Sequence, residues 1–169
     1  MFDFFKKLFQ KRKTSNKEKI ISAIISFGIL VFAGLLSWNL FDFSYYKSLI
    51  KSEVMPSDQV LLIIFVILFI LLGLSGYFVW NYYHTNFKRK LFAILHLANG
   101  LLIYLWSYCF FGQNNLSGAL LTAIGIIIVS EIMIVTAFQN IRKTVYLLLP
   151  YLLFAIFATY LNATIISLN

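Results

Sequence analysis

The sequence has few charged residues. Only 12% of its 169 residues are Asp, Glu, Lys or Arg, whereas 61% are hydrophobic. An ordinary soluble domain carries about 25% charged residues, so this chain could not cover its surface with polar groups in water. The composition therefore excludes a soluble domain and predicts an integral membrane protein.

Cysteine is nearly absent as well. The single Cys109 excludes an internal disulfide and, without a second cysteine, a thiolate metal cluster. The sequence also contains no Ser-His-acid set, no glycine-rich phosphate loop and no cluster of metal ligands. Hydrolytic chemistry, phosphoryl transfer and a metal site are therefore not expected.

Acidic residues are scarce: six Asp and Glu oppose 14 Lys and Arg, which gives a net charge of +8. The basic residues lie in blocks outside the apolar runs. This excess therefore indicates how the chain is oriented in a membrane, and nucleic acid is not an expected partner.

Long apolar runs are what the sequence has in abundance. Each of five runs approaches the roughly 20 residues that a helix needs to cross a bilayer core. The sequence thus predicts an all-α integral membrane protein, a five-transmembrane-helix bundle forming one domain over residues 20–169. The predicted spans are about 20–40, 60–80, 91–111, 118–138 and 145–165.

The basic blocks predict an orientation. Seven basic residues precede the first span, Lys88 to Lys90 separate the second from the third, and Arg142 and Lys143 separate the fourth from the fifth. Because Lys and Arg are retained on the cytoplasmic side, we expect a multi-pass protein of the cell membrane with its N-terminus in the cytoplasm and its C-terminus outside. The abundance of Phe, Ile, Lys, Asn and Tyr suits an AT-rich bacterial genome.

Two segments outside the spans each allow two interpretations. Residues 1–19 form a basic amphipathic segment, which is either a short helix in the membrane interface or a fluctuating tail. Residues 41–59 are the only connection long enough to fold over the bundle. They are either a lid over a pocket or an ordinary solvated loop.

Small residues recur within the spans. Small side chains let transmembrane helices approach closely, so these positions predict packing faces between helices. They are Ser22, Ser26, Gly73, Gly76, Ala119 and Ala123.

Two ionisable residues lie inside predicted spans. A charged group in the membrane is costly, so Glu131 is either functional or a neutral, hydrogen-bonded core residue. His96 could be an axial haem ligand, but no second ligand stands at a matching spacing, which favours a hydrogen-bonded packing role.

Aromatic residues make up 18% of the chain. Trp38 and Trp80 lie near span ends, as residues of an interfacial aromatic belt do. Trp106 lies inside the third span, in a run of aromatic residues from 106 to 111. This run could line a cavity for a flat apolar ligand.

The order of several motifs resembles the TspO/MBR family, the tryptophan-rich sensory proteins related to the mitochondrial translocator protein. The resemblance covers essentially the whole chain from residue 20 and is strongest in the closing span. The motifs are Tyr46-Lys47-Ser48-Leu49, Trp106-Ser107 with Phe110-Phe111-Gly112, Pro150-Tyr151-Leu152-Leu153, and Phe157-Ala158-Thr159-Tyr160-Leu161-Asn162.

The resemblance implies a ligand-binding or sensory membrane protein, usually dimeric, whose pocket opens toward the first loop. It implies binding of a tetrapyrrole such as protoporphyrin IX or haem, with no cofactor required. Carried over by position, the ligand-binding residues are Tyr46, Pro56, Gln59, Phe65, Phe69, Asn99, Trp106, Phe110, Phe154, Ala158 and Asn162.

The chain lacks several tryptophans of the family pattern. Gln59, Phe65 and Phe154 stand where tryptophans are usual, so aromatic faces remain but indole N–H donors are lost. Porphyrin photodegradation, which is proposed for the family, depends on those tryptophans. We therefore expect no enzymatic activity.

Two other functions remain open at this point. A small membrane transport component could use Glu131, Asn99 and Asn162 to line a polar path for a weakly polar or hydrophobic solute. Alternatively, a non-catalytic membrane scaffold could use its aromatic residues for packing alone.

Overall fold

The computed structural model describes residues 14–40, 44–82, 86–138 and 142–169, without the side chains of 33, 35–40 and 86. Helices joined by short coils, with no strand, make up these residues. This confirms the all-α prediction. The helices are α2 (Asn16–Leu40), α3 (Ser44–Ser48), α4 (Asp58–Tyr82), α5 (Asn86–Ser107), a π-helical turn η1 (Tyr108–Gly112), α6 (Leu116–Phe138) and α7 (Arg142–Leu168). Most of the predicted N-terminal segment, residues 1–13, lies outside the described residues.

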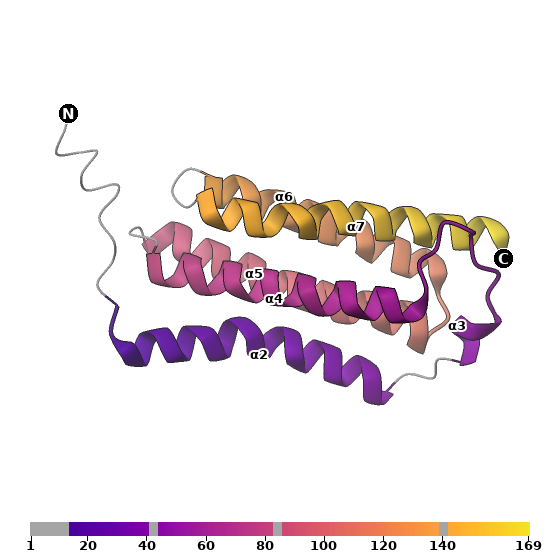
Figure 1. Cartoon of the computed structure of the whole chain (residues 1–169), viewed down its shortest axis with the longest axis horizontal. Helices are drawn as coiled ribbons and strands as arrows, with labels where there is room; N and C mark the ends of the chain where they lie inside the picture. The colour runs from indigo at the N-terminus through magenta and orange to yellow at the C-terminus, as the bar shows by residue number, and fades with distance from the viewer. Residues whose placement is uncertain (1–13, 41–43, 83–85, 139–141) are drawn as a thin grey trace.

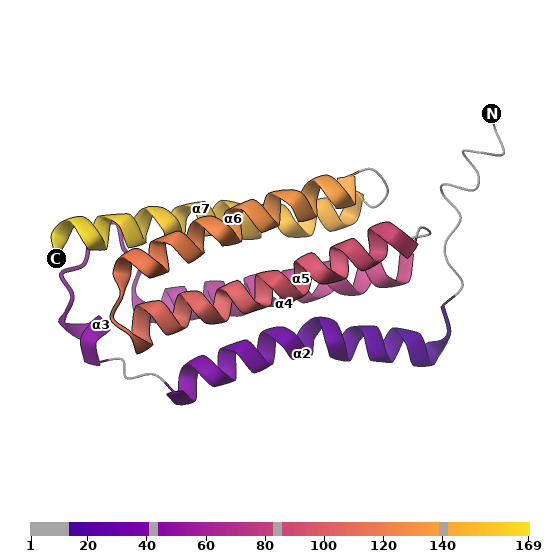
Figure 2. The same ribbon diagram turned by 180° about the vertical axis from the view of Figure 1, so that it is seen from behind.

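The five long helices run side by side in three tiers (Figures 1 and 2). The pair α6 and α7 forms one tier, α4 and α5 form the middle, and α2 packs on the other side of the middle pair. We call the end with α3 the α3 end and the other, where α2 begins and α4 ends, the α2-start end. At the α3 end, the coil that follows the short α3 passes beside the last turns of α7 (Figures 1 and 2).

Four helices, α4, α5 with η1, α6 and α7, are long and apolar enough to cross a membrane. They contain the predicted spans 60–80, 91–111, 118–138 and 145–165 and extend them by a few residues at one or both ends. The predicted first span, 20–40, is helical as part of α2. Its later side chains lie outside the described part of the chain, and its role as a fifth span stays a prediction.

Local sequence signals explain where helices begin. Ser15 and Glu18 form a reciprocal capping box at the start of α2, with the Ser15 N–H bonded to the Glu18 carboxylate at 3.1 Å and the Glu18 N–H bonded to Ser15 Oγ at 3.2 Å. Asn115 caps α6 by accepting a 2.8 Å bond from the Gly118 N–H. Asn114, with φ of 53°, makes the preceding turn, which asparagine tolerates better than most residues.

The predicted small residues do lie on packing faces. Ser22, Ser26, Ala119 and Ala123 are each at most 6% exposed. Gly73 and Gly76 are also buried. A methyl group on Gly73 would come within 2.5 Å of the Phe27 ring. The glycine therefore allows α2 to pack closely against α4.

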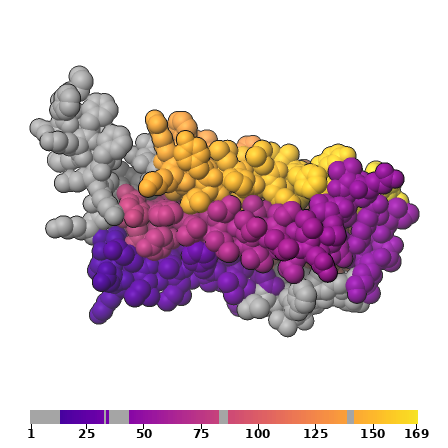
Figure 3. Space-filling model, in the orientation of Figure 1, coloured from indigo at the N-terminus to yellow at the C-terminus, as the bar shows by residue number. Residues whose placement is uncertain are grey.

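The first loop contacts the bundle through a few residues, while many of its other side chains remain exposed. Leu49 is 8% exposed and belongs to a core cluster with Phe110, Ala119 and Ile165. The side chain of Asn169 accepts a 3.0 Å bond from the Ile50 N–H and donates a 3.1 Å bond to the Ile50 oxygen. We call residues 44–57 the lid segment. In the space-filling view it covers the α3 end beside α7 (Figure 3).

We expect Gly73→Ala to lower the stability of the bundle by about 1 to 3 kcal/mol, because its methyl group would overlap the Phe27 ring and force repacking. Gly28→Ala on α2 is the matched control, since nothing lies within 4 Å of its methyl position. Thermal unfolding in the same detergent compares the two. Equal melting temperatures for both variants would contradict the tight contact.

Candidate functional site

Two adjoining cavities occupy the α3 half of the bundle. The outer cavity, of about 570 Å³, lies beside the lid segment, and the inner cavity, of about 260 Å³, lies deeper among α4, α5, α6 and α7, with Gly34 of α2 also in its lining. The outer cavity falls within the roughly 300 to 1,000 Å³ typical of ligand sites. The two share the lining residues Leu62, Phe65, Trp106, Phe111, Phe154 and Ala158.

Aromatic rings form the shared wall. The Phe65 and Phe154 rings meet edge to face with centroids 5.4 Å apart, which joins α4 to α7. The Trp106 ring stacks on Phe110 at 5.3 Å and meets Phe111 edge-on at 5.8 Å. Flat faces from three helices therefore surround one apolar space.

A polar network lies at the mouth of the outer cavity. The Tyr46 hydroxyl donates a 2.7 Å bond to the Asp58 carboxylate, and Lys51 approaches the same carboxylate at 3.5 Å. The Lys51 ammonium also lies 3.7 Å from the centroid of the Tyr46 ring. Burial, with the hydrogen bond to Asp58, raises the pKa of the Tyr46 phenol above its usual range. Tyr46 therefore stays neutral and holds the lid segment to the start of α4.

A buried chain of hydrogen bonds lies beneath the inner cavity. The Tyr151 hydroxyl donates a 2.6 Å bond to Asn99 Oδ1, and the Asn99 amide donates a 3.1 Å bond to Ser130 Oγ. Ser130 in turn donates a 2.6 Å bond to the Ile126 oxygen of its own helix. These residues are at most 5% exposed, apart from Ile126 at 9%. The chain joins α7, α5 and α6.

Asn162 is the one strongly polar side chain deep in the outer cavity's described lining. Its amide donates a 3.1 Å bond to the Leu116 oxygen at the start of α6. Its Oδ1 atom is buried and has no hydrogen-bond partner among the described residues. A bound molecule with an N–H or O–H group could satisfy this oxygen.

Nine of the eleven predicted ligand-binding residues line the two cavities. They are Tyr46, Gln59, Phe65, Phe69, Trp106, Phe110, Phe154, Ala158 and Asn162. The two others do not. Asn99 is fully buried between helices, where its side chain bonds Tyr151 and Ser130. Pro56 does not line the outer cavity, but its neighbour Met55 does.

The structure adds lining residues that sequence reasoning missed. Phe111 and Tyr151 belong to the family motifs named above but were not predicted to bind the ligand. Tyr151, Ala155 and Ala158 follow one another at intervals of four and three residues, which places them on one face of α7. That spacing could have revealed Tyr151 and Ala155. Lys47 and Met55 reach the outer cavity from the lid segment, and no periodic signal identifies them.

The polar path of the transport alternative does not form. Glu131 is exposed on the outer face of α6, whereas Asn99 and Asn162 are buried at 0% and 2% exposure. Glu131 makes no ion pair with Arg142 or Lys143 in the described part of the chain. Glu131 thus does not share a path with the two asparagines.

His96 has the predicted packing role. Its Nε2 atom lies 3.0 Å from the backbone oxygen of Ser26, so it donates a hydrogen bond from α5 to α2. It lines neither of the two large cavities. This arrangement argues against axial ligation of a haem in them.

Comparison with known proteins places the chain among small membrane proteins. The sequence profile of the TspO/MBR family matches residues 21–168. The uncharacterized membrane protein YtaB of Bacillus subtilis is 36% identical over 155 residues, which cover 90% of this chain and 99% of that protein. The tryptophan-rich protein TspO of Bacillus cereus is 31% identical over 91% of this chain and 98% of its own length. The protein of the same name from Chlorobaculum tepidum is 36% identical over 74% of this chain and 79% of its own length.

We expect Tyr151→Phe to destabilise the bundle by about 1 to 3 kcal/mol, because it leaves the buried Asn99 Oδ1 without its donor. Tyr160→Phe on the same helix is the control, since Tyr160 is 53% exposed and its change should be nearly neutral. Chemical or thermal unfolding in detergent measures both. If the two variants lose equal stability, the hydrogen-bond chain is not the cause.

We expect Asn169→Ala to loosen the lid segment, because it removes both side-chain bonds to Ile50. Limited trypsin digestion should then cleave after Lys51 about threefold to tenfold faster. Ser167→Ala is the control, because the exposed Ser167 bonds only within α7. An unchanged cleavage rate in Asn169→Ala would show that Leu49 packing and the Tyr46–Asp58 bond hold the segment without Asn169.

Proposed function

The chain belongs to the TspO/MBR family, and from this membership and the two joined cavities we propose that it is a membrane ligand-binding or sensory protein for a flat hydrophobic molecule. A tetrapyrrole such as protoporphyrin IX or haem is the proposed ligand. Its site is the space beneath the lid segment. The observation that carries the proposal is one apolar space bounded by Trp106, Phe65, Phe154 and Phe111.

The lining supports a defined orientation of the ligand. The macrocycle lies among the aromatic rings, which offer stacking and edge contacts to a flat π system. Lys47 and Gln59 line the outer cavity near its mouth, where an ammonium and an amide can bind the carboxylates of a porphyrin. The Oδ1 atom of Asn162 accepts from a donor on the ligand.

A metal-free porphyrin is the better match of the two tetrapyrroles. No histidine or cysteine lies among the described residues that line either cavity. These are the residues that most often ligate haem iron, so haem would be held by its ring and carboxylates. We propose a binding role without chemical turnover of the pigment.

The proposed setting is a homodimer in the cell membrane. The α2-start end carries the basic residues Lys17, Lys19, Lys88, Arg89, Lys90, Arg142 and Lys143. We propose that this end faces the cytoplasm, because basic residues are retained there. The lid segment and the mouth of the outer cavity then face the opposite side.

Titration of the protein in lipid nanodiscs with protoporphyrin IX tests the proposal. We expect saturable quenching of tryptophan fluorescence, most of which Trp106→Phe removes while the ring surface for binding remains. Ala158→Phe should weaken binding at least about tenfold, because Ala158 lines both cavities and the added ring fills their shared space.

Ala163→Phe is the matched control, since Ala163 is exposed on the same helix and should leave affinity unchanged. Empty nanodiscs correct for porphyrin partitioning into lipid. Equal affinities for Ala158→Phe and Ala163→Phe, or quenching that never saturates in the unaltered protein, would reject binding in these cavities.

A further inference from the structure

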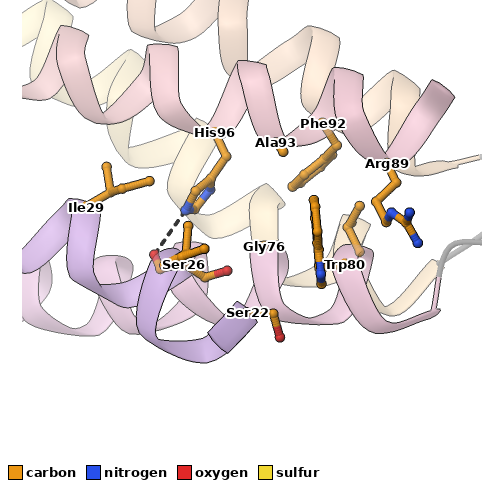
Figure 4. Close-up of a pocket in the computed structure, with 11 residues that line it drawn as sticks. Ser22, Ser26, Ile29, Gly76, Trp80, Arg89, Phe92, Ala93 and His96 are labelled. Carbon is orange, nitrogen blue, oxygen red and sulfur yellow. Dashed lines mark hydrogen bonds between the residues drawn. The ribbon is translucent and has the colours of Figure 1, made fainter. Parts of the chain in front are cut away.

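A third cavity lies in the α2-start half of the bundle, between α2, α4 and α5 (Figure 4). It shares no lining residue with the two large cavities. Along α5 it reaches from Arg89 to His96, about 10 Å of helix. It is therefore a separate space from the proposed tetrapyrrole site.

His96 gives this cavity a buried hydrogen-bond acceptor. In Figure 4 its ring reaches from α5 toward Ser26 on α2, where the Nε2 bond to the backbone oxygen is drawn. A carbonyl oxygen only accepts hydrogen bonds, so Nε2 carries the hydrogen and the neutral ring leaves Nδ1 as an acceptor. His96 is 3% exposed, and its Nδ1 has no partner among the described residues.

The remaining walls are mostly apolar. Trp80 and Phe92 contribute ring surfaces, and Ile25, Ile29, Val79 and Ala93 complete the apolar lining. The Arg89 guanidinium lies 4.9 Å from the centroid of the Trp80 ring, at the outer side of the cavity (Figure 4). Ser22 already donates to the Lys19 oxygen and accepts from Asn81.

The cavity is small. Its volume is about 70 Å³, roughly half of the 150 Å³ of an apolar cavity that binds benzene, so a single small ring enters only when the surrounding side chains move apart. Gly76 keeps this space open beside His96, because a methyl group there would lie 3.2 Å from His96 Cε1 and 2.9 Å from Ser26 Oγ.

We propose that this cavity binds a small, uncharged, ring-sized molecule with a single O–H or N–H donor, of the phenol or indole class. The ring packs between Trp80 and Phe92. The donor meets His96 Nδ1, after a small adjustment of the cavity wall that shields this atom.

Other occupants match the lining less well. A buried water needs two to four polar partners; besides His96 the lining offers Ser26, Arg89 and Ser22, whose hydroxyl already has two partners. An anion could pair with Arg89 at the outer side, but beside His96 it would bring its negative charge against the lone pair of Nδ1. A metal ion lacks ligands, because no group of three His, Cys, Asp or Glu exists among the described residues.

A pair of probes isolates the hydrogen bond. The protein in lipid nanodiscs is titrated with 4-fluorophenol and with fluorobenzene, which lacks the donor, and binding is followed by ¹⁹F NMR against empty nanodiscs. We expect both to bind saturably, with 4-fluorophenol preferred by about threefold to tenfold after correction for partitioning.

His96→Met should abolish this preference while fluorobenzene still binds, which shows that the cavity has kept its shape. Ala93→Phe, which fills the cavity from α5, should abolish the binding that prefers 4-fluorophenol. Ala158→Phe, in the large cavities, should leave the preference for 4-fluorophenol unchanged.

Three results would overturn the proposal. One is the absence of saturable binding to the unaltered protein, which leaves a cavity holding water only. Another is an undiminished preference for 4-fluorophenol in His96→Met. The third is a preference for 4-fluorophenol that Ala158→Phe removes and Ala93→Phe leaves intact, which assigns the hydrogen-bonded probe to the large cavities.

Discussion

The buried chain from Tyr151 through Asn99 to Ser130 is the interaction on which the architecture of the site depends. Within a bilayer no water competes for these groups, and each would be costly if left without a partner. Their bonds join α7, α5 and α6 at fixed rotations about the helix axes. The same rotations turn Trp106 and Phe154 toward one another and leave the inner cavity above Tyr151.

The two ends of the bundle are built differently. At the α3 end, Asn169 and Leu49 hold the lid segment on the bundle, while Tyr46 ties it to the start of α4. At the α2-start end, small residues and His96 bring α2 against α4 and α5. A lid held by a few polar contacts can open at modest cost. At the other end, α2 packs closely on α4 at Gly73, where a larger side chain would overlap Phe27.

Much of the site could be predicted because the resemblance to the TspO/MBR family carries pocket positions over to this sequence. Phe65 and Phe69 on α4, and Phe154 and Ala158 on α7, are such positions, and each pair lines the cavities. Asn99 faces the neighbouring helices and not the cavities. A polar residue inside a span can face a ligand or a neighbouring helix, and the local sequence is the same in both cases. The sequence could not decide between a lid and a solvated loop, because the two residues that anchor the segment, Ile50 and Asn169, lie far apart along the chain.

What the sequence determined by itself is the set of helices and their approximate ends. Long apolar runs must satisfy their backbone groups internally in lipid, and this requirement acts locally along the chain. Only the tertiary structure decided which face of each helix meets which neighbour. Ser26 accepts from His96, and Glu131 points outward while Ser130 beside it points inward. Adjacent residues on a helix differ by about 100° in direction, so a hydrophobic run with apolar residues on all sides does not specify its own rotation, and packing against the other helices supplies it.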